Sequence, residues 1–600
     1  MKKIVIILNV FAMMLLSSCI NEDLLEKADT GDLTLTNVYA DIRQADNVLN
    51  GLYNRVRNIR QADGNLYGEL HAGTYLDAAS IYGQGNQTWS VSETLVSGAW
   101  NASNCPFTAT TDRGIYSRDY VSIRAIYLFL ENIEKVPFDP EFGYGAIQQQ
   151  QKIGEAQFLL AWHYHEMMRF FGGITLVKSS LTSSSDEILA PRNTYDECVD
   201  YVTHLCDSAS EKLPLSWPSN QLGRVTKGAA FALKARVLLY AASPLFNNPN
   251  KPENSPFRGK YDVKKWEKAA AAAAEVIKLG QYSLYPDISR LFVMNTNPEV
   301  IFQRMGPMHK GMENFDLPGT VGQNPKGGLG HNMATYNLLQ LYKILKNGVV
   351  YNQNDPASGF NLQDPYKNLD PRFYRDIVYN GAKCLRVPTG AQMWAKGEDG
   401  TEGPANGQTY NTFLFLSKFC DPLIDATKSA NTWHQMIYIR YAEVLLNYAE
   451  AMNEAFGPEI DGLGIGMTAR NAVNIIRKRT TFPAIINYMG YKGGMPDFPI
   501  NLSRDDFRKE IRQERKVELA YEGHMFFDFR RWREPVESQQ TVKWLIPSRK
   551  INKTFSYSLY SLIRPFTTAN YLFPLNDSQI LLNPKLIQNP GWPGSPEAEN

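Results

Sequence analysis

Residues 226–242 read TKGAAFALKARVLLYAA, and small and apolar side chains recur there at the spacing of a helix. Alanine at such positions lets two helices pack closely, because it adds little bulk between their axes. The stretch before it, residues 195–213 (YDECVDYVTHLCDSASEKL), opens with a capping box formed by Thr194 and Glu197. Together the two stretches predict a helical hairpin over residues 194–242.

The same pattern returns later in the chain. Residues 263–280 (VKKWEKAAAAAAEVIKLG) are again loaded with alanine, and a second hairpin is predicted from residues 434–455 and 468–480. Loops between the helices vary in length, so a strict 34-residue period is absent, and the helices are tetratricopeptide-like in pairing alone. The predicted fold class is mainly α, a tetratricopeptide-like helical-hairpin scaffold with an irregular, loop-rich cap that contains short β-strands.

The cap is expected between about residues 280 and 432, where glycine, proline, asparagine and aromatic residues become frequent. Runs such as EVIFQRM (299–305) and TFLFLSKF (412–419) predict short strands within it. Near the start of the chain, Thr36 is a candidate N-cap for a helix over residues 37–60. Residues 61–118 then form a long irregular stretch, and such loops are usually functional or disordered.

The beginning of the chain has the pattern of an export signal. Lys2 and Lys3 precede an apolar run, residues 4–16, which is too short for the ~20 residues that a membrane span needs. Leu16-Ser17-Ser18-Cys19 resembles a bacterial lipobox, which predicts a signal peptide over residues 1–18 and acylation of Cys19. The alternative is an ordinary signal peptide with a chance cysteine. Residues 19–35 form an acidic tether that resembles the surface-export signal of Bacteroidetes lipoproteins, or that is simply solvated.

Composition and motifs exclude several functions. The net charge is +1, so no general attraction to nucleic acid or anionic lipid is expected. Cys198 and Cys206 would lie ~12 Å apart on a helix, too far for a disulfide. No nucleotide-binding P-loop, GxSxG or HExxH motif is present. We predict no disulfide framework, no metal, no cofactor and no catalytic residue.

Two motifs have a simpler structural explanation. DGLGIG (461–466) has the outline of a phosphate-binding loop, but it follows a predicted helix instead of a strand, which favours a connection between paired helices. His163 and His165 lie two apart on a predicted helix, about 200° around its axis, so they cannot face one metal ion. Packed, hydrogen-bonded histidines are expected instead.

Charge is densest in residues 503–534, where nine Lys/Arg residues meet eight Asp/Glu residues. Acidic residues recur there every four positions, at Asp506, Glu510, Glu514, Glu518 and Glu522. Like charges at this spacing repel each other, so this acidic stripe needs cations from elsewhere. We expect them from Arg530, Arg531 and Arg533, or from Arg440 and Arg477; the alternative is a solvated stripe.

Five blocks of the chain, in order and behind the lipobox, resemble the SusD/RagB family of outer-membrane nutrient-binding lipoproteins of Bacteroidetes. They are EAQFLLAWHYHEMMRFFGGI (155–174), GRVTKGAAFALKARVLLYAASPLF (223–246), IYIRYAEVLLNYAEAMNEA (437–455), IRQERKVELAYEGHMFFDFRRW (511–532) and NPKLIQNPGW (583–592). The resemblance implies an N-terminal helical region over residues 36–280 and a C-terminal region with the cap over residues 281–600. It also implies surface exposure on the outer membrane, a SusC-like TonB-dependent transporter as partner, and delivery of an oligosaccharide without bond chemistry.

The family's blocks are structural, so the ligand site is argued from local residue types. An aromatic ring can stack on the flat face of a sugar while polar groups bond its hydroxyls. Tyr82, Trp89 and Trp100 in the long early stretch are the first candidates, and Trp394 in the cap is another. Asn101 and Asp77 are candidates for bonding hydroxyls. The alternative is that the tryptophans pin their loops to the body.

Two rival functions stay open. A surface glycoside hydrolase needs two carboxylates ~5 to 10 Å apart, and Glu69, Asp77 and Glu93 lie in the early stretch. A pure scaffold would use its helix pairs to bind a protein partner alone. Whether the ligand is a glycan or a peptide does not follow from the sequence.

Overall fold

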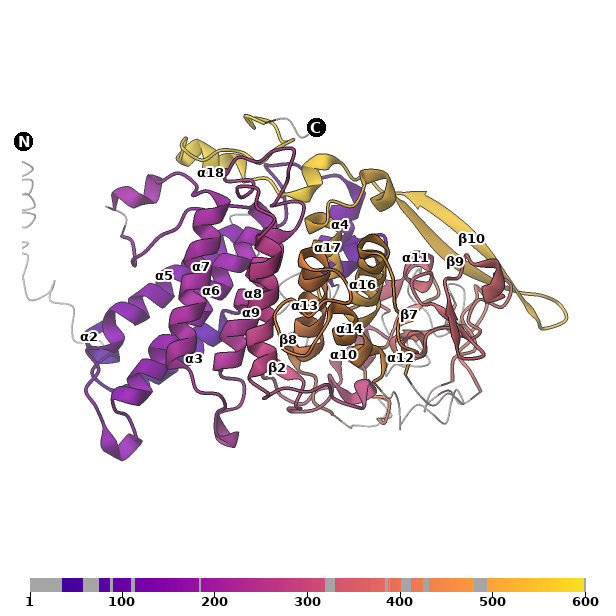
Figure 1. Cartoon of the computed structure of the whole chain (residues 1–600), viewed down its shortest axis with the longest axis horizontal. Coiled ribbons are helices and arrows are strands. Elements are labelled where there is room, and N and C mark those ends of the chain that lie inside the picture. The colour runs from indigo at the N-terminus through magenta and orange to yellow at the C-terminus, as the bar shows by residue number, and fades with distance from the viewer. Residues whose placement is uncertain are drawn as a thin grey trace, which may run out of the picture.

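Two halves make up the molecule in the computed structural model, with long helices on one side and an irregular cap on the other (Figure 1). The structure describes residues 35–57, 75–86, 90–108, 114–182, 185–318, 330–383, 387, 389–400, 412–424, 431–479 and 494–597. Within these ranges, no helix combines the length and the apolar character that crossing a membrane requires.

Helices account for most of the regular structure, which confirms the predicted fold class. The helices are α2 (Leu35–Val38), α3 (Ile42–Asn54), α4 (Val91–Ser97), α5 (Ile115–Ile133), α6 (Ala146–Phe171), α7 (Tyr195–Lys212), α8 (Lys227–Ala242), α9 (Lys265–Lys278), α10 (Gly311–Phe315), α11 (Tyr336–Leu339), α12 (Pro371–Asp376), α13 (Tyr441–Ala455), α14 (Ala469–Arg477), α16 (Arg504–Glu518), α17 (Met525–Arg531) and α18 (Asp577–Leu582). Helices α5 to α9 pack on one another in sequence order, and α9 then packs on α13. The second hairpin therefore continues the stack begun by the first.

The predicted hairpin over residues 194–242 is formed by α7 and α8. Its capping box is confirmed, because Thr194 N–H donates to Glu197 Oε2 at 2.8 Å and Glu197 N–H donates to Thr194 Oγ1 at 3.4 Å. Alanines of α8 and α9 are buried where these helices meet. Cys198 and Cys206 are both buried free thiols, as their spacing predicted.

Three predicted boundaries are wrong. Thr36 does not cap a helix over residues 37–60: α2 is a single turn, and α3 begins at Ile42, where Asp41 accepts the Arg43 N–H at 2.7 Å. The second hairpin does not start at residue 434, because Met436–Arg440 is a strand, consistent with its β-branched and aromatic residues. The early stretch over residues 61–118 contains α4, which Ser90 caps.

Short antiparallel strands form the cap and its borders. Strands β1 (Gly83–Gly85), β3 (Asn332–Ala334), β7 (Phe415–Leu416) and β6 (Ile377–Val378) form one sheet in that order, β2 (Val300–Arg304) pairs with β8 (Met436–Arg440), β4 (Ile344–Lys346) pairs with β5 (Val349–Tyr351), and β9 (Thr541–Arg549) pairs with β10 (Phe555–Ile563). The two expected runs, EVIFQRM and TFLFLSKF, supply β2 and β7. The β9–β10 ribbon extends at the end of the molecule remote from α5 and α6 (Figure 1).

A network of buried ions joins α16 to both halves. Arg440, at the end of β8, contacts Glu518 Oε1 at 2.8 Å, Glu522 Oε2 at 2.7 Å and Glu299 Oε1 at 2.7 Å. Lys418, from the cap, contacts Glu522 Oε1 at 2.7 Å. Burial alone would raise the pKa of Glu518, but neighbouring guanidinium groups hold that pKa well below its usual range.

Of the two alternative sets of counterions, Arg440 and Arg477 are confirmed as partners of the acidic stripe. Arg477 contacts Glu514 Oε2 at 3.1 Å, as Arg440 contacts Glu518. Arg372, which no local sequence pattern indicated, contacts Glu514 Oε1 at 2.6 Å and Glu518 Oε2 at 3.1 Å. Two of the alternative cations have other partners: Arg531 pairs with Glu450 and Asp528, and Arg530 lies against phenylalanine rings. The third, Arg533, lies over the Tyr571 ring, 5.6 Å from its centroid.

We predict that Glu514→Gln lowers the free energy of unfolding by about 3 kcal/mol, because it leaves Arg372 and Arg477 buried with one anion fewer. Chemical denaturation measures this loss. Asp505→Asn on the same helix is the control, since its exposed pair with Arg508 is worth about 1 kcal/mol or less. Ligand affinity should not change in either variant. Equal stability of the two variants would contradict the role of the network.

Candidate functional site

Two of the predicted ligand-binding residues lie in the interior. Asp77 has no exposed surface, and its carboxylate accepts the N–H of Phe526 at 3.0 Å and of Gly523 at 3.2 Å. Tyr82 is 7 % exposed, and its hydroxyl accepts a hydrogen bond from Lys516 Nζ at 3.0 Å. Their polar atoms thus hold the early segment against α16 and α17, so in this structure neither presents a surface to a ligand.

Trp100 and Asn101 make contacts within the protein. The Trp100 ring lies 5.5 Å from Phe573 and 5.1 Å from Trp592, centroid to centroid, and its indole N–H donates to Leu95 O at 3.2 Å. Asn101 is exposed, and its side-chain oxygen accepts the Ser103 N–H at 2.9 Å. These contacts match the alternative in which Trp100 pins its loop to the body. Cys19, Glu69 and Trp89 lie outside the described residues.

Trp394 lies at the surface of the cap, partly exposed. Its ring centroid is 5.1 Å from that of Phe555, and the guanidinium carbon of exposed Arg549 lies 5.2 Å from the centroid of the Trp394 ring. Phe555 and Arg549 are cross-strand partners in the β9–β10 ribbon, so their side chains lie on the same face of it. An accessible indole beside a cation with free donors fits a ligand with both flat apolar faces and hydroxyls.

Glycines fix the turn that presents Trp394. A Cβ at Gly400 would lie 1.6 Å from Trp394 O, and a Cβ at Gly397 would lie 2.2 Å from Gln392 O. Asp399 closes the turn, because its N–H donates to Gln392 O at 3.1 Å and its carboxylate accepts the Gln392 N–H at 3.3 Å. The indole is therefore carried on a backbone that tolerates no side chain at either glycine.

The ribbon continues the aromatic surface beyond Trp394. Tyr557 is two residues from Phe555 on the same face, and its hydroxyl accepts a hydrogen bond from Asn380 Nδ2 at 3.3 Å. On the other face Trp544 and Tyr560 stack with centroids 5.3 Å apart, and Tyr560 is 53 % exposed. Sequence analysis missed these residues, although the alternation in FSYSLYSLI (555–563) was a strand signal.

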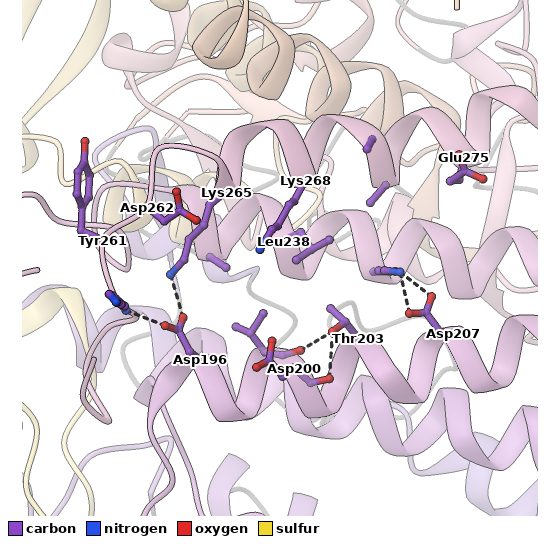
Figure 2. A pocket seen from close by; sticks show the side chains of 16 residues that line it. Asp196, Asp200, Thr203, Asp207, Leu238, Tyr261, Asp262, Lys265, Lys268 and Glu275 are labelled. Carbon is purple, nitrogen blue, oxygen red and sulfur yellow. Dashed lines mark hydrogen bonds and ion pairs between the residues drawn. The ribbon is translucent and has the colours of Figure 1, made fainter. Parts of the chain in front are cut away.

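A charged groove of about 760 Å³ runs between α7, α8 and α9 (Figure 2). Asp196, Asp200 and Asp207 follow one face of α7, and Lys265 faces them from α9. Lys265 Nζ contacts Asp196 Oδ1 at 2.9 Å, and Lys234 Nζ of α8 contacts Asp207 Oδ1 at 2.6 Å. These ion pairs cross-link the helices. Tyr261 is the one aromatic residue in its lining, so the groove suits ring stacking less than the cap does.

The weaker motifs are structural. His163 is buried, with Nδ1 3.0 Å from Asp119 Oδ1, as expected. His165 is buried and its ring packs 5.5 Å from that of Tyr240, but its Nε2 has no hydrogen-bond partner among the described residues, so the expected hydrogen bonding is confirmed for His163 alone. The DGLGIG stretch connects α13 to α14, and Asp461 accepts the N–H groups of Ile465 and Gly466 at 3.1 and 2.7 Å. Within the described ranges, no group of three or more His, Cys, Asp or Glu side chains is arranged to hold a metal ion.

Family models match nearly the whole chain. A model described as the SusD family matches residues 298–592, and one described as starch-binding associating with outer membrane matches residues 23–239. The chain belongs to the SusD family. This confirms the resemblance seen in the sequence blocks, and the second model supports outer-membrane association.

Relatives of this SusD-family protein are distant in sequence and similar in fold. SusD-like protein P38 of Formosa agariphila is 23% identical over 466 residues, which are 76% of each chain. A SusD-like protein of Bacteroides fragilis has a TM-score of 0.69 at 24% identity, covering 92% of this chain and 97% of its own. A SusD-like carbohydrate binding protein of the same species has a TM-score of 0.68 at 19% identity, covering 91% and 99%.

Asp77 gives this SusD-family protein a pH-dependent stability. Burial raises the pKa of Asp77 from 3.8 to about 7, although two backbone N–H groups oppose the shift. An acid whose pKa is higher in the folded state binds more protons when folded than when unfolded. The contribution of protonated Asp77 to the free energy of unfolding is therefore complete below pH 4 and is lost as the pH rises from 4 through 7.

We therefore predict that Asp77→Asn removes part of the fall in unfolding free energy between pH 4 and pH 7. The difference in unfolding free energy between wild type and variant should change by up to about 4 kcal/mol between pH 4 and pH 7, since one pKa unit is worth about 1.4 kcal/mol. Denaturation at pH 4, 5, 6 and 7 measures it. Parallel curves for the two proteins would contradict this assignment.

Proposed function

We propose that this protein is a cell-surface, lipid-anchored glycan-binding protein that captures an oligosaccharide and delivers it to a SusC-like TonB-dependent transporter in the outer membrane. The observation that carries the glycan proposal is Trp394, a partly exposed indole held on a tight glycine turn beside Phe555 and Arg549. The ring supplies a stacking face for a sugar, and the guanidinium supplies donors for its hydroxyls.

The family findings support the same ligand class. One matching family model is described as starch-binding, and a similar structure is named as carbohydrate binding. The proposed partner and delivery step rest on the SusD-family membership and on the lipobox-like sequence before Cys19. Several acyl chains at Cys19 would hold the protein firmly at a membrane, because each buried CH₂ contributes about 0.8 kcal/mol.

Trp394→Ala should weaken oligosaccharide binding about tenfold, since a stacking contact of this kind is worth about 1 to 1.5 kcal/mol. A glycan array first identifies a bound oligosaccharide, and isothermal titration calorimetry then measures its affinity. Phe142→Ala is the control, because Phe142 is an exposed aromatic residue of the helical half (56 %). Equal affinity of the Trp394→Ala variant and wild type would place the glycan elsewhere.

Replacing Cys19 tests the anchor. Cys19→Ala should move the protein from the membrane fraction to the soluble fraction and abolish its labelling by fatty acid, because the acylated thiol is gone. Ser17→Ala leaves the cysteine in place and should remain membrane-bound. Continued membrane association of the Cys19→Ala variant in high salt would contradict a lipid anchor.

Two alternatives make different predictions. A glycoside hydrolase would release reducing sugar, but Asp77 is buried against backbone N–H groups and Glu93 bonds Gln84 Nε2 at 2.9 Å, so neither is set beside an open sugar site. A protein-binding scaffold would bind the transporter with no affinity for any glycan. We propose that the protein is a binding protein and not an enzyme.

A further inference from the structure

A small pocket lies at the base of the β9–β10 ribbon, where α4, α17 and the residues after β10 meet. Its volume is about 30 Å³, room for one or two water molecules. Its lining includes Val96, Trp100, Arg530, Gln539, Arg564 and Asn570. Val96, Trp100 and Asn570 are partly exposed, so the pocket opens to the surface.

Arg564 lines this pocket, and one of its three side-chain nitrogens has no hydrogen-bond partner among the described residues. It is 4 % exposed, and Nη1 donates to Ser80 O at 2.6 Å and to Gly83 O at 3.0 Å, while Nη2 donates to Gln84. Its Nε is buried and has no hydrogen-bond partner among the described residues. The same holds for Oε1 of Gln539, which is 4 % exposed. Two residues that line the pocket thus each carry a buried polar atom without a described partner, one a donor and one an acceptor, and buried polar groups of folded proteins are rarely left without one.

Arg530 adds a second buried cation. It is 6 % exposed, donates to Asn570 O at 3.0 Å and to Phe526 O at 2.5 Å, and lies 3.7 Å from the centroid of the Phe526 ring. No carboxylate of the described residues forms an ion pair with Arg530 or Arg564, although Glu93 acts on Arg564 from further away. Burial lowers the pKa of Arg530 to about 9 and that of Arg564 to about 10.

Most other buried arginines have an anion. Arg236 pairs with Glu443, Arg440 with Glu518, and Arg515 with Asp528, at 2.6 to 2.8 Å. Arg192 is an informative exception, because backbone carbonyls accept a hydrogen bond from each of its three side-chain nitrogens, Nε, Nη1 and Nη2. Arg564 differs from Arg192 at its Nε, which has no acceptor among the described residues. Its pocket is therefore lined by two buried cations without a described ion-pair partner, one of which has a nitrogen without an acceptor.

We propose that this pocket binds the oxyanion of an acidic sugar, with the carboxylate of a uronic acid entering between Arg530 and Arg564. This inference rests on the proposed glycan-binding function and narrows the ligand class. The Arg564 Nε donates to the carboxylate, and the Gln539 Oε1 accepts a hydrogen bond from a neighbouring sugar hydroxyl. Trp100 lies at the rim beside the sugar ring. A sulfate half-ester shares the oxyanion chemistry and is separated from a carboxylate in the test below.

The pocket is a different site from Trp394. It adjoins the base of the ribbon, whereas Trp394 adjoins Phe555 at the other end of β10. Nine strand residues rise about 30 Å, so the two sites can be tested independently.

A charge placed at the rim tests the proposal without removing a buried arginine. Val96→Asp puts an anion beside the pocket, and Val96→Asn is the neutral variant of equal size. Calorimetry with D-galacturonate, D-galactose and sodium sulfate is run on wild type and both variants. We expect galacturonate to bind wild type and Val96→Asn, to bind Val96→Asp at least tenfold more weakly, and to weaken with rising salt. Galactose should not distinguish the variants.

Arg564→Gln should also lose galacturonate binding, with Lys543→Gln as a control of equal charge change on β9. Equal galacturonate affinity of Val96→Asp and Val96→Asn, or no binding by wild type, would overturn the proposal. Tighter binding of sulfate than of galacturonate would support the oxyanion site and assign it to a sulfate ester. If galacturonate does not bind but neutral oligosaccharides still bind in a way that depends on Trp394, the proposed glycan-binding function stands and the acidic-sugar pocket is wrong. If no glycan binds at all, the proposed function itself is contradicted.

Discussion

The buried charges around Glu518 are the constraint on which the arrangement of the molecule depends. Arg440 links the end of β8 to the Glu518 carboxylate, and Arg372 links the cap to the same carboxylate. Removing ions from water is expensive, so each of these groups needs its partners in place at once. The network therefore sets how the cap sits on the helices, and the cap in turn positions the ribbon and Trp394. In this protein, geometry at the surface is fixed by electrostatics in the interior.

Local patterns predicted the helical half well. The capping box at Thr194 and the alanines of α8 and α9 are decided by neighbours in sequence, and both are confirmed. The four-residue acidic repeat correctly signalled a need for cations. The identity of the cations depends in part on contacts between residues more than a hundred positions apart, as with Arg372 and Glu514. No local sequence pattern encodes such contacts.

The candidate site was harder to predict for the same reason. Asp77 and Tyr82 have the chemistry of ligand-binding residues, but Gly523, Phe526 and Lys516 use that chemistry internally. Trp394 was predicted because it is an aromatic residue of the cap and lies outside the scaffold helices, whose aromatic residues have a core to fill. Its neighbours Phe555 and Arg549 lie about 150 residues later in sequence and come together with it only through the ribbon. The pocket at Arg530 and Arg564 likewise depends on which buried side chains of the folded protein have no described ion-pair partner, and this does not follow from the sequence.

The β9–β10 ribbon has an open side. Among the described strands, β10 pairs with β9 alone, so its outer row of backbone N–H and C=O groups faces no other strand. The Gln363 side chain bonds both groups of Tyr557 in this row, at 2.9 and 3.0 Å. Leu559, Leu562 and Ile563 are exposed along it, a combination that invites side-by-side association of two copies. Arg549, Lys550 and Lys553 crowd the turn with positive charge. Two ribbons that approach each other tip to tip therefore repel each other electrostatically. This repulsion opposes association through the open strand edge when the local concentration of the protein is high.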